Sequence, residues 1–154
     1  MTGQRAAQPP VVGDHLPELR IDAIDPRDIM LMALVLRDPN PIHYDVDAVR
    51  AAGLGEVEVN QGGATMAYLL NMLSRWTGSQ ANLRSIRCRF SANVLAGDNV
   101  TAGGTVTAVT PDDRSPGDVI VECDVWVERD DGVRAVTGSA RVRYPLAGTA
   151  AVQV

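Results

Sequence analysis

Two side chains that can move protons lie five residues apart in a segment rich in proline. Asp38 and His43 flank the run Pro39-Asn40-Pro41-Ile42. Proline fixes φ and favours an extended conformation in the residue before it, so Asp38 and Asn40 are not expected to continue a helix. A carboxylate and an imidazole held on one rigid turn can bind a water molecule between them, as general acid–base chemistry requires. The alternative is a turn that ends a helix and places a histidine at the surface.

The elements before and after this segment determine where the two side chains point. Asp25-Pro26 is typical of a helix start, with aspartate as the N-cap and proline at the first helical position. Apolar residues follow at helical spacing until Pro39 ends the pattern. The segment 38–43 therefore follows a helix C-terminus, in a loop of the kind that commonly contains functional residues. A second, short helix is expected over Asp45–Ala52.

The remaining pattern predicts one long helix and several strands. The helix follows Asn60-Gln61-Gly62-Gly63, has Met66, Leu69, Leu70 and Leu73 on its apolar face, and ends at Gly78. Extended segments are predicted for residues 11–24, 86–90, 100–109, 119–129 and 133–144, the last two joined by a hairpin at Asp130-Asp131-Gly132. A long helix followed by antiparallel strands predicts an α+β fold in which a sheet wraps around a helix.

Composition predicts one globular domain. The chain has 154 residues, of which 45% are hydrophobic and 21% charged. No apolar run approaches the roughly 20 residues that cross a bilayer, so no membrane partner is expected. Residues 1–10 are expected to form a disordered leader, 11–146 the domain and 147–154 a flexible tail. Cys88 and Cys123 stand alone in apparent strands, which favours reduced core thiols, no metal site and a cytoplasmic location.

The charges are unevenly distributed along the chain. The net charge of −5 argues against nucleic-acid binding. All 14 cationic side chains are arginine, which excludes Schiff-base chemistry on a lysine of this chain. Between Glu58 and Asp98 there are four arginines and no acidic residue. Three of them, Arg84, Arg87 and Arg89, are candidates to bind the phosphates of coenzyme A or phosphopantetheine, since arginine binds phosphate oxygens in bidentate fashion. The alternative is a solvated basic strand.

The segment 38–43 resembles the signature of the MaoC-like, (R)-specific enoyl-CoA hydratases and dehydratases, with Arg37 where the family usually has glycine. Val12-Gly13-Asp14-His15-Leu16-Pro17 resembles the usual beginning of the domain in this family. Phe90, Val94, Gly97 and Asp98 resemble its second motif, with Asn93 in place of a proline. The resemblance implies a single hotdog domain that pairs as a homodimer or as a heteromer with a related hotdog chain.

The resemblance also implies a reaction. Its substrate would be a trans-2-enoyl thioester that gains water, or a 3-hydroxyacyl thioester that loses it, with no further cofactor. Asp38 and His43 would hold the water, and Asn40 would orient it or a nearby carbonyl. A backbone N–H at the start of the long helix would bind the enolate oxygen. Counting from His43 places Asn60-Gln61 where the family usually has His-Gly, which makes Gln61 the donor, whereas a shift of one residue makes it Gly62.

Several alternatives remain open. Val59-Asn60 and Trp76-Thr77-Gly78 resemble an actinobacterial subgroup that includes sterol side-chain hydratases, some of which work as hetero-oligomers. The same chemistry run as a dehydration on acyl carrier protein substrates is a second possibility. A non-catalytic hotdog subunit of a hetero-oligomer is a third. A hotdog thioesterase is less favoured, because such enzymes generally place a carboxylate on or near the central helix and residues 59–97 contain none.

Overall fold

The computed structural model describes residues 9–146, and its five antiparallel strands form one sheet in the order β1-β3-β4-β5-β2. The strands are β1 (Leu19–Ile21), β2 (Leu83–Phe90), β3 (Val100–Pro111), β4 (Val119–Arg129) and β5 (Arg134–Tyr144). The last four confirm the predicted strands within a few residues. The prediction for residues 11–24 was too long, because a positive φ of 95° at Gly13 and the following Pro17 interrupt the extended chain before β1.

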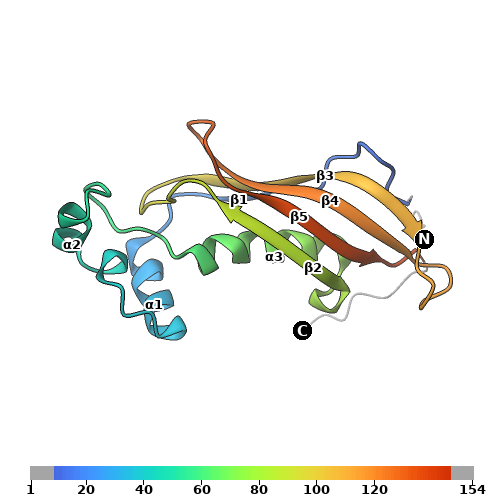
Figure 1. Cartoon of the computed structure of the whole chain (residues 1–154), viewed down its shortest axis with the longest axis horizontal. Coiled ribbons are helices and arrows are strands. Elements are labelled where there is room, and N and C mark those ends of the chain that lie inside the picture. The colour runs from blue at the N-terminus through green and yellow to red at the C-terminus, as the bar shows by residue number, and fades with distance from the viewer. Residues whose placement is uncertain (1–8, 147–154) are drawn as a thin grey trace, which may run out of the picture.

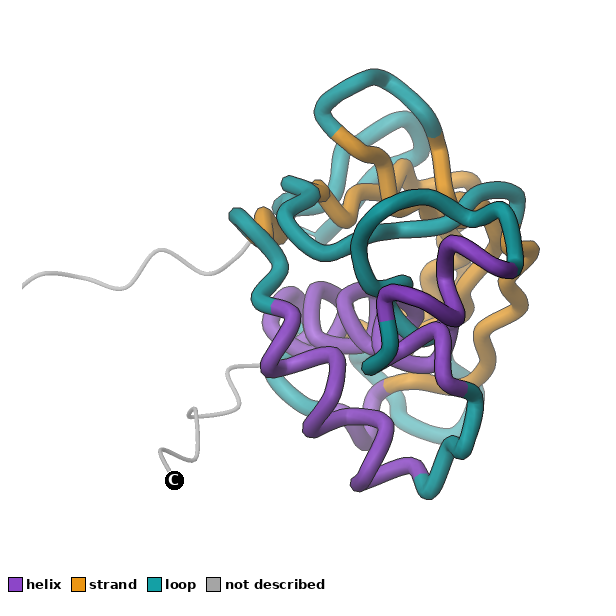
Figure 2. Tube along the Cα trace, turned by 90° about the vertical axis from the view of Figure 1, so that its left-hand side faces the viewer, coloured by secondary structure: helices purple, strands orange, loops and turns teal. Residues whose placement is uncertain are grey.

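The helical elements lie on one side of this sheet (Figures 1 and 2). They are α1 (Pro26–Leu36), η1 (Pro41–His43), α2 (Val46–Ala51), α3 (Gly62–Thr77) and η2 (Gln80–Asn82). The sheet curves over α3, whereas α1 and α2 lie beyond the N-terminal end of that helix (Figure 1). The predicted arrangement of a sheet around one long helix is therefore confirmed.

The core lies between α3 and the concave face of the sheet. Leu69, Met72 and Leu73 of α3 are at most 2% exposed and pack in one cluster with buried valines of β3, β4 and β5. Burying one such side chain stabilises the fold by about 1.5–3 kcal/mol. Leu70, predicted for the same face, is only half-buried, because the helix is rotated so that Met72 faces the sheet in its place.

Both cysteines are free thiols, as predicted. Burial raises the pKa of the Cys123 thiol to about 12, which keeps it protonated and unreactive. No group of three or more His, Cys, Asp or Glu side chains within residues 9–146 has the arrangement of a metal site. None of the helices in that range is long and apolar enough to cross a membrane. The predicted tail and most of the predicted leader lie outside the described residues.

Candidate active site

The way in which α1 ends directs Asp38 toward η1. Asp25 caps the start of α1, where its Oδ1 accepts a hydrogen bond of 2.8 Å from the Arg27 N–H. At the other end Arg37 adopts left-handed backbone angles, φ 53° and ψ 41°, and the Asp38 N–H donates to the Ala33 carbonyl. This turn is the usual helix C-terminal motif, in which glycine is the preferred residue. It reverses the chain, so Asp38 leaves the helix on the side of η1.

Asp38 and His43 lie together on one turn, as predicted, but in direct contact, so a water molecule fits beside the two groups and not between them. His43 Nε2 lies 3.3 Å from Asp38 Oδ2. The imidazole side chain is 7% exposed and the carboxylate 34%, so water reaches the pair from the aspartate side. The other carboxylate oxygen, Oδ1, accepts a hydrogen bond of 3.0 Å from the Asn40 N–H, which orients the carboxylate.

The remaining ring nitrogen of His43 is bound to the main chain. Nδ1 lies 2.6 Å from the carbonyl oxygen of Val59, and the Val59 N–H in turn donates to the carbonyl of Ile42. A carbonyl can only accept, so Nδ1 is the donor and the neutral ring keeps its lone pair on Nε2. The basic nitrogen therefore faces Asp38, and a water molecule beside the pair can donate to both.

Asn40 is placed beside the pair, but its side chain supports the turn. Its Oδ1 accepts from the Ile42 N–H at 3.4 Å and caps η1. The NH₂ group and the second lone pair of the oxygen remain available, so the role of orienting water stays a prediction. Asn40 thus contributes to the site through its backbone N–H, which was not predicted.

The start of α3 is a second reactive feature, because no side chain caps it. The first N–H groups of a helix have no partner within the helix, and its dipole favours negative charge there. The Asn60 N–H is bound to the Val94 carbonyl, so it is not available. Gln61 is the N-cap residue, and its buried side chain donates from Nε2 to the Ile29 carbonyl at 2.8 Å. Gly62 is the first helical residue and is exposed.

Two contacts bring the pair and the start of α3 together. Val59, which binds His43, is only three residues before Gly62. On the other side, Leu36 Cδ1 lies 3.7 Å from the position that a Cβ on Gly63 would occupy, and Leu36 is two residues before Asp38. A carboxylate, an imidazole and unpaired helix amides thus converge on one region.

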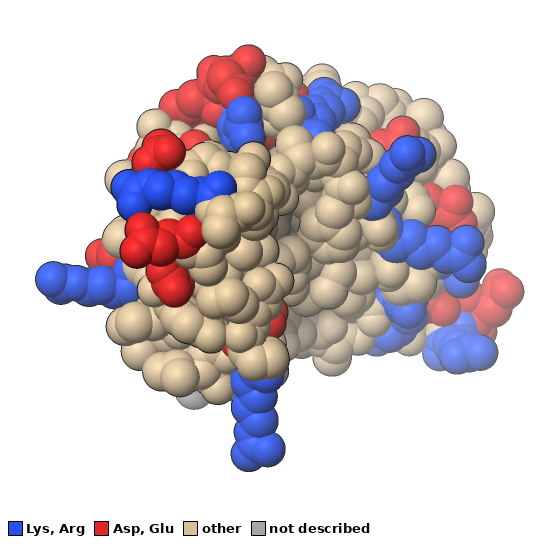
Figure 3. Space-filling view, turned by 60° about the vertical axis from the view of Figure 1, so that its left-hand side comes forward, with Lys and Arg blue, Asp and Glu red and all other residues tan. Residues whose placement is uncertain are grey.

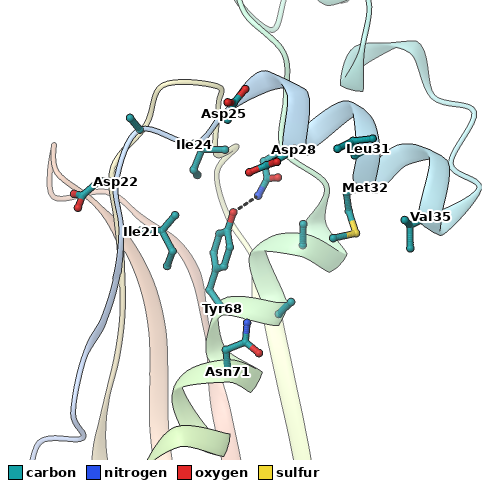
Figure 4. A pocket seen from close by; sticks show the side chains of 14 residues that line it. Ile21, Asp22, Ile24, Asp25, Asp28, Leu31, Met32, Val35, Tyr68 and Asn71 are labelled. Atoms are coloured by element: carbon teal, nitrogen blue, oxygen red, sulfur yellow. Dashed lines mark hydrogen bonds between the residues drawn. The ribbon is translucent and has the colours of Figure 1, made fainter. Parts of the chain in front are cut away.

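A cavity of about 630 Å³ opens beside this region, between α1 and α3. We call it the α1–α3 cavity; residues 21–35 form one wall and residues 60–71 the other. Asn60 and Ala64 line its end near the start of α3. Most of its lining is apolar, and its polar lining residues include Tyr68 and Asn71 of α3 and three aspartates, of which Asp28 lies nearest to Tyr68 (Figure 4).

A second hollow, of about 560 Å³, lies on the other flank of α1. This α1 C-terminal hollow is lined by Met30, Ala33, Leu34, Arg37, Asp38, Pro39 and Tyr44. Arg37 is the only cationic side chain among the residues that line the two cavities. Seen from the side of α1 and α2, the surface is hollowed along a mainly uncharged groove whose rims bear charged side chains (Figure 3).

The three candidate arginines on β2 are not gathered at this region. Arg84, Arg87 and Arg89 are exposed, and none of them lines either cavity. Arg89 precedes Phe90, whose ring lies 3.4 Å from a Cβ position on Gly62, so it is near the start of α3. Arg84 is five residues away, or roughly 17 Å along the strand, and donates to the Ala81 carbonyl. Phosphate binding by these residues stays a prediction.

Two contributors to the site were missed in the sequence. Val59 acts through its main-chain carbonyl, so its side chain leaves no signal. Tyr68 could have been noticed as the only residue with a polar group in the helix segment Met66–Leu70. Nothing in the sequence pattern, however, indicates that it lies across a cavity from residues 21–28.

Comparison with known proteins identifies the family. A model of the MaoC like domain matches residues 9–128. The chain belongs to the MaoC-like domain family. The beta subunit of the 3-oxo-4,17-pregnadiene-20-carboxyl-CoA hydratase of Mycobacterium tuberculosis is 37% identical over 102 residues, which cover 64% of this chain and 75% of that protein.

Solved MaoC-like structures share the fold. The ChsH1–ChsH2 complex from Mycobacterium tuberculosis includes a chain with a TM-score of 0.72 and 29% identity, covering 87% of this chain and 98% of that one. The (R)-hydratase from A. caviae involved in PHA biosynthesis matches with a TM-score of 0.75 and 24% identity, over 90% of this chain and 100% of that one. The MaoC-like chain is therefore a hotdog domain, as its motifs predicted.

Proposed function

We propose that this chain adds water to trans-2-enoyl thioesters, or removes it from 3-hydroxyacyl thioesters, with coenzyme A or phosphopantetheine as the thiol. One observation carries the proposal: Asp38 Oδ2 and His43 Nε2 lie 3.3 Å apart while Val59 holds the proton on Nδ1. This pair presents two acceptors to one water molecule. Family membership and relatives named as hydratases support the same reaction class.

In the hydration direction the water is the nucleophile. His43 Nε2 takes a proton from the water, whose oxygen forms a bond to C3 of the enoyl group. The C2=C3 electrons move onto the thioester, and C2 then receives a proton from the pair. Asp38 orients the water, then receives the proton from His43 Nε2, 3.3 Å away, and delivers it to C2. Acid–base catalysis of this kind contributes about 10²- to 10⁴-fold.

The negative charge that develops on the thioester oxygen requires a donor. The N–H of Gly62 at the uncapped start of α3 fits this role, and the N–H of Gln61 is the other candidate. Loss of one such donor costs roughly 3 kcal/mol of transition-state stabilisation in other enzymes. A main-chain donor explains how the site can lack the family's usual His-Gly and keep the reaction.

The two cavities suggest how the substrate lies. The α1–α3 cavity begins at Asn60 and Ala64, next to the donors, and its lining contains no cation, so it suits a neutral acyl group. The α1 C-terminal hollow contains Arg37 beside Asp38, which suits the side from which the phosphate-bearing end of coenzyme A or phosphopantetheine arrives.

Assembly with a second hotdog chain is part of the proposal. The similar Mycobacterium tuberculosis protein is named as a beta subunit, and the similar structure is that of a complex. Because this chain has both Asp38 and His43, it would be the catalytic member of a heteromer, or either member of a homodimer.

The decisive experiment follows the loss of enoyl-thioester absorbance with purified protein and crotonyl-CoA. Asp38→Asn and His43→Ala are each expected to lower kcat by about 10²-fold or more. Asp113→Asn and His15→Ala, which make the same changes away from the pair, should leave kcat unchanged. Near-native turnover by the His43→Ala variant would rule out the mechanism.

A further inference from the structure

Tyr68 has an unused hydrogen-bond donor in the α1–α3 cavity. Its phenol oxygen accepts from Asn60 Nδ2 at 3.4 Å, and the same amide donates to Thr65 Oγ1 at 3.0 Å. Thr65 Oγ1 in turn donates to the Gln61 carbonyl. This chain of bonds fixes the phenol oxygen, whereas the phenol O–H donates to no acceptor within residues 9–146. Burial, with a contribution from the Asp28 charge, raises the pKa of Tyr68, so the proton stays on the oxygen.

Asp28 supplies an unused acceptor to the same cavity. It lies in the first turn of α1, and its carboxylate accepts no hydrogen bond and forms no ion pair with the described residues. In Figure 4 the phenol of Tyr68 points from α3 toward the wall on which Asp28 lies. A half-buried donor and an exposed acceptor from different elements thus line one cavity, and neither is bound to another side chain within residues 9–146 in that role.

The charge of the cavity restricts what can bind there. Asp22, Asp25 and Asp28 are among the residues that line it, and none of these lining residues is cationic. Asp22 forms an ion pair with Arg20, and Asp25 accepts the Arg27 N–H. A carboxylate or phosphate would therefore be repelled. A keto oxygen would accept from Tyr68 but would form no hydrogen bond with Asp28, which is exposed and would stay hydrated. A hydroxyl group both accepts and donates, so it satisfies both side chains.

We propose that the α1–α3 cavity recognises a hydroxyl group on the acyl part of the substrate, with Tyr68 as its donor and Asp28 as its acceptor. The inference rests on the proposed function, because that function places an acyl group in this cavity. This hydroxyl group is distal to C2 and C3, the carbons that react. Tyr68 is six residues beyond Gly62, or roughly 9 Å along the helix axis, so the group lies several carbons from the thioester.

The test measures binding, so that it does not depend on turnover. Saturated acyl-CoA esters of graded chain length are titrated by calorimetry in pairs, each plain ester beside its ω-hydroxyl counterpart. At one chain length we expect the hydroxyl ester to bind about tenfold more tightly. Tyr68→Phe should reduce this ratio to about one. Tyr144→Phe removes a phenol oxygen outside the cavity and should leave the ratio as it is.

The ω-carboxyl and ω-amino esters of the same length test the charge. The carboxyl ester should bind more weakly than the plain ester, and Asp28→Asn should narrow this difference. Preference for the amino ester over the hydroxyl ester would overturn the proposal in favour of a cation site. Equal affinity for plain and hydroxyl esters at every length would also overturn it.

The binding test and the hydration assay separate the two proposals. Tighter binding of the hydroxyl esters without hydration of crotonyl-CoA would support hydroxyl recognition in the α1–α3 cavity and would rule out the proposed reaction. Hydration of crotonyl-CoA without tighter binding of the hydroxyl esters would support the reaction and would rule out hydroxyl recognition by Tyr68 and Asp28.

Discussion

Asp38 and His43 face each other with two hydrogen-bond acceptors. With the Nδ1 proton bound to the Val59 carbonyl, a direct hydrogen bond at 3.3 Å requires an additional proton on one of the two groups. Without it, a water molecule that donates to both relieves the repulsion between their lone pairs. The pair is thus arranged to attract the reactant that the proposed hydration consumes.

Arg37 adopts a backbone conformation that glycine tolerates better. A left-handed φ costs a residue with a Cβ about 1 kcal/mol or more relative to glycine. We therefore expect Arg37→Gly to increase the free energy of unfolding by about 1 kcal/mol, measured by urea denaturation. Leu34→Gly, at an exposed position within α1, should decrease it by about 1 kcal/mol.

Unchanged or decreased stability in the Arg37→Gly variant would contradict this expectation. The presence of arginine at this strained position is in keeping with a role beside Asp38 in the α1 C-terminal hollow. A rise in the KM for crotonyl-CoA with little change in kcat would connect the Arg37 side chain to the phosphates of the substrate.

The catalytic side chains of the site could be predicted from the sequence, whereas the main-chain hydrogen bonds that hold them could not. Proline and spacing placed Asp38 and His43 on one turn, and the structure confirms that turn. The bond from His43 to Val59 joins residues 16 positions apart through a main-chain atom, so no side-chain pattern encodes it. The same reason leaves the oxyanion donor open between Gln61 and Gly62.

Among the elements, α1 is less firmly held than α3. Only Ile29 and Ala33 of α1 are buried, and cavities lie on both of its flanks. Helices with few buried apolar contacts open at lower free energy. Hydrogen–deuterium exchange should therefore be faster in the amides of residues 30–36 than in those of 66–76. Binding of an acyl-CoA should slow exchange in α1, and equal protection of both helices without ligand would contradict this prediction.

The pairing of β2 with β5 depends on Gly138. A Cβ at this position would lie 2.0 Å from the Arg87 carbonyl oxygen, a main-chain atom that cannot rotate away. Gly138→Ala should therefore destabilise the protein by about 1–3 kcal/mol, measured as the free energy of unfolding. Ser139→Ala, at the exposed neighbouring position, should change it by less than about 0.5 kcal/mol. Native stability in Gly138→Ala would show that the strands adjust.

Periodicity predicted most elements well. The alternation in β2 and the apolar runs of β3, β4 and β5 located these strands, and Asp25-Pro26 located the start of α1. The segment before β1 was harder, because its pairing depends on strand β3, some 80 residues away. The rotation of α3 that buries Met72 and half-exposes Leu70 is likewise set by the sheet around it.

At the scale of the whole molecule, apolar surface remains uncovered. Leu34 and Val35 of α1 are 69% and 75% exposed, and Phe90 at the end of β2 is 49% exposed. Exposed apolar patches mark interaction sites. We expect native mass spectrometry to find an assembly larger than the 16.4 kDa monomer. In protein purified from its native host, a second chain in the assembly would indicate a heteromer and a doubled mass a homodimer, whereas a monomer without any second chain would contradict the proposed assembly.

The bond between His43 and Val59 has a consequence for how the site tolerates variation. Every amino acid has a main-chain carbonyl, so any substitution at position 59 that preserves the backbone keeps the histidine tautomer. An insertion or deletion between residues 44 and 58 would instead move that carbonyl away from the ring. Reactivity of the imidazole should thus be robust to point changes in this loop and sensitive to its length.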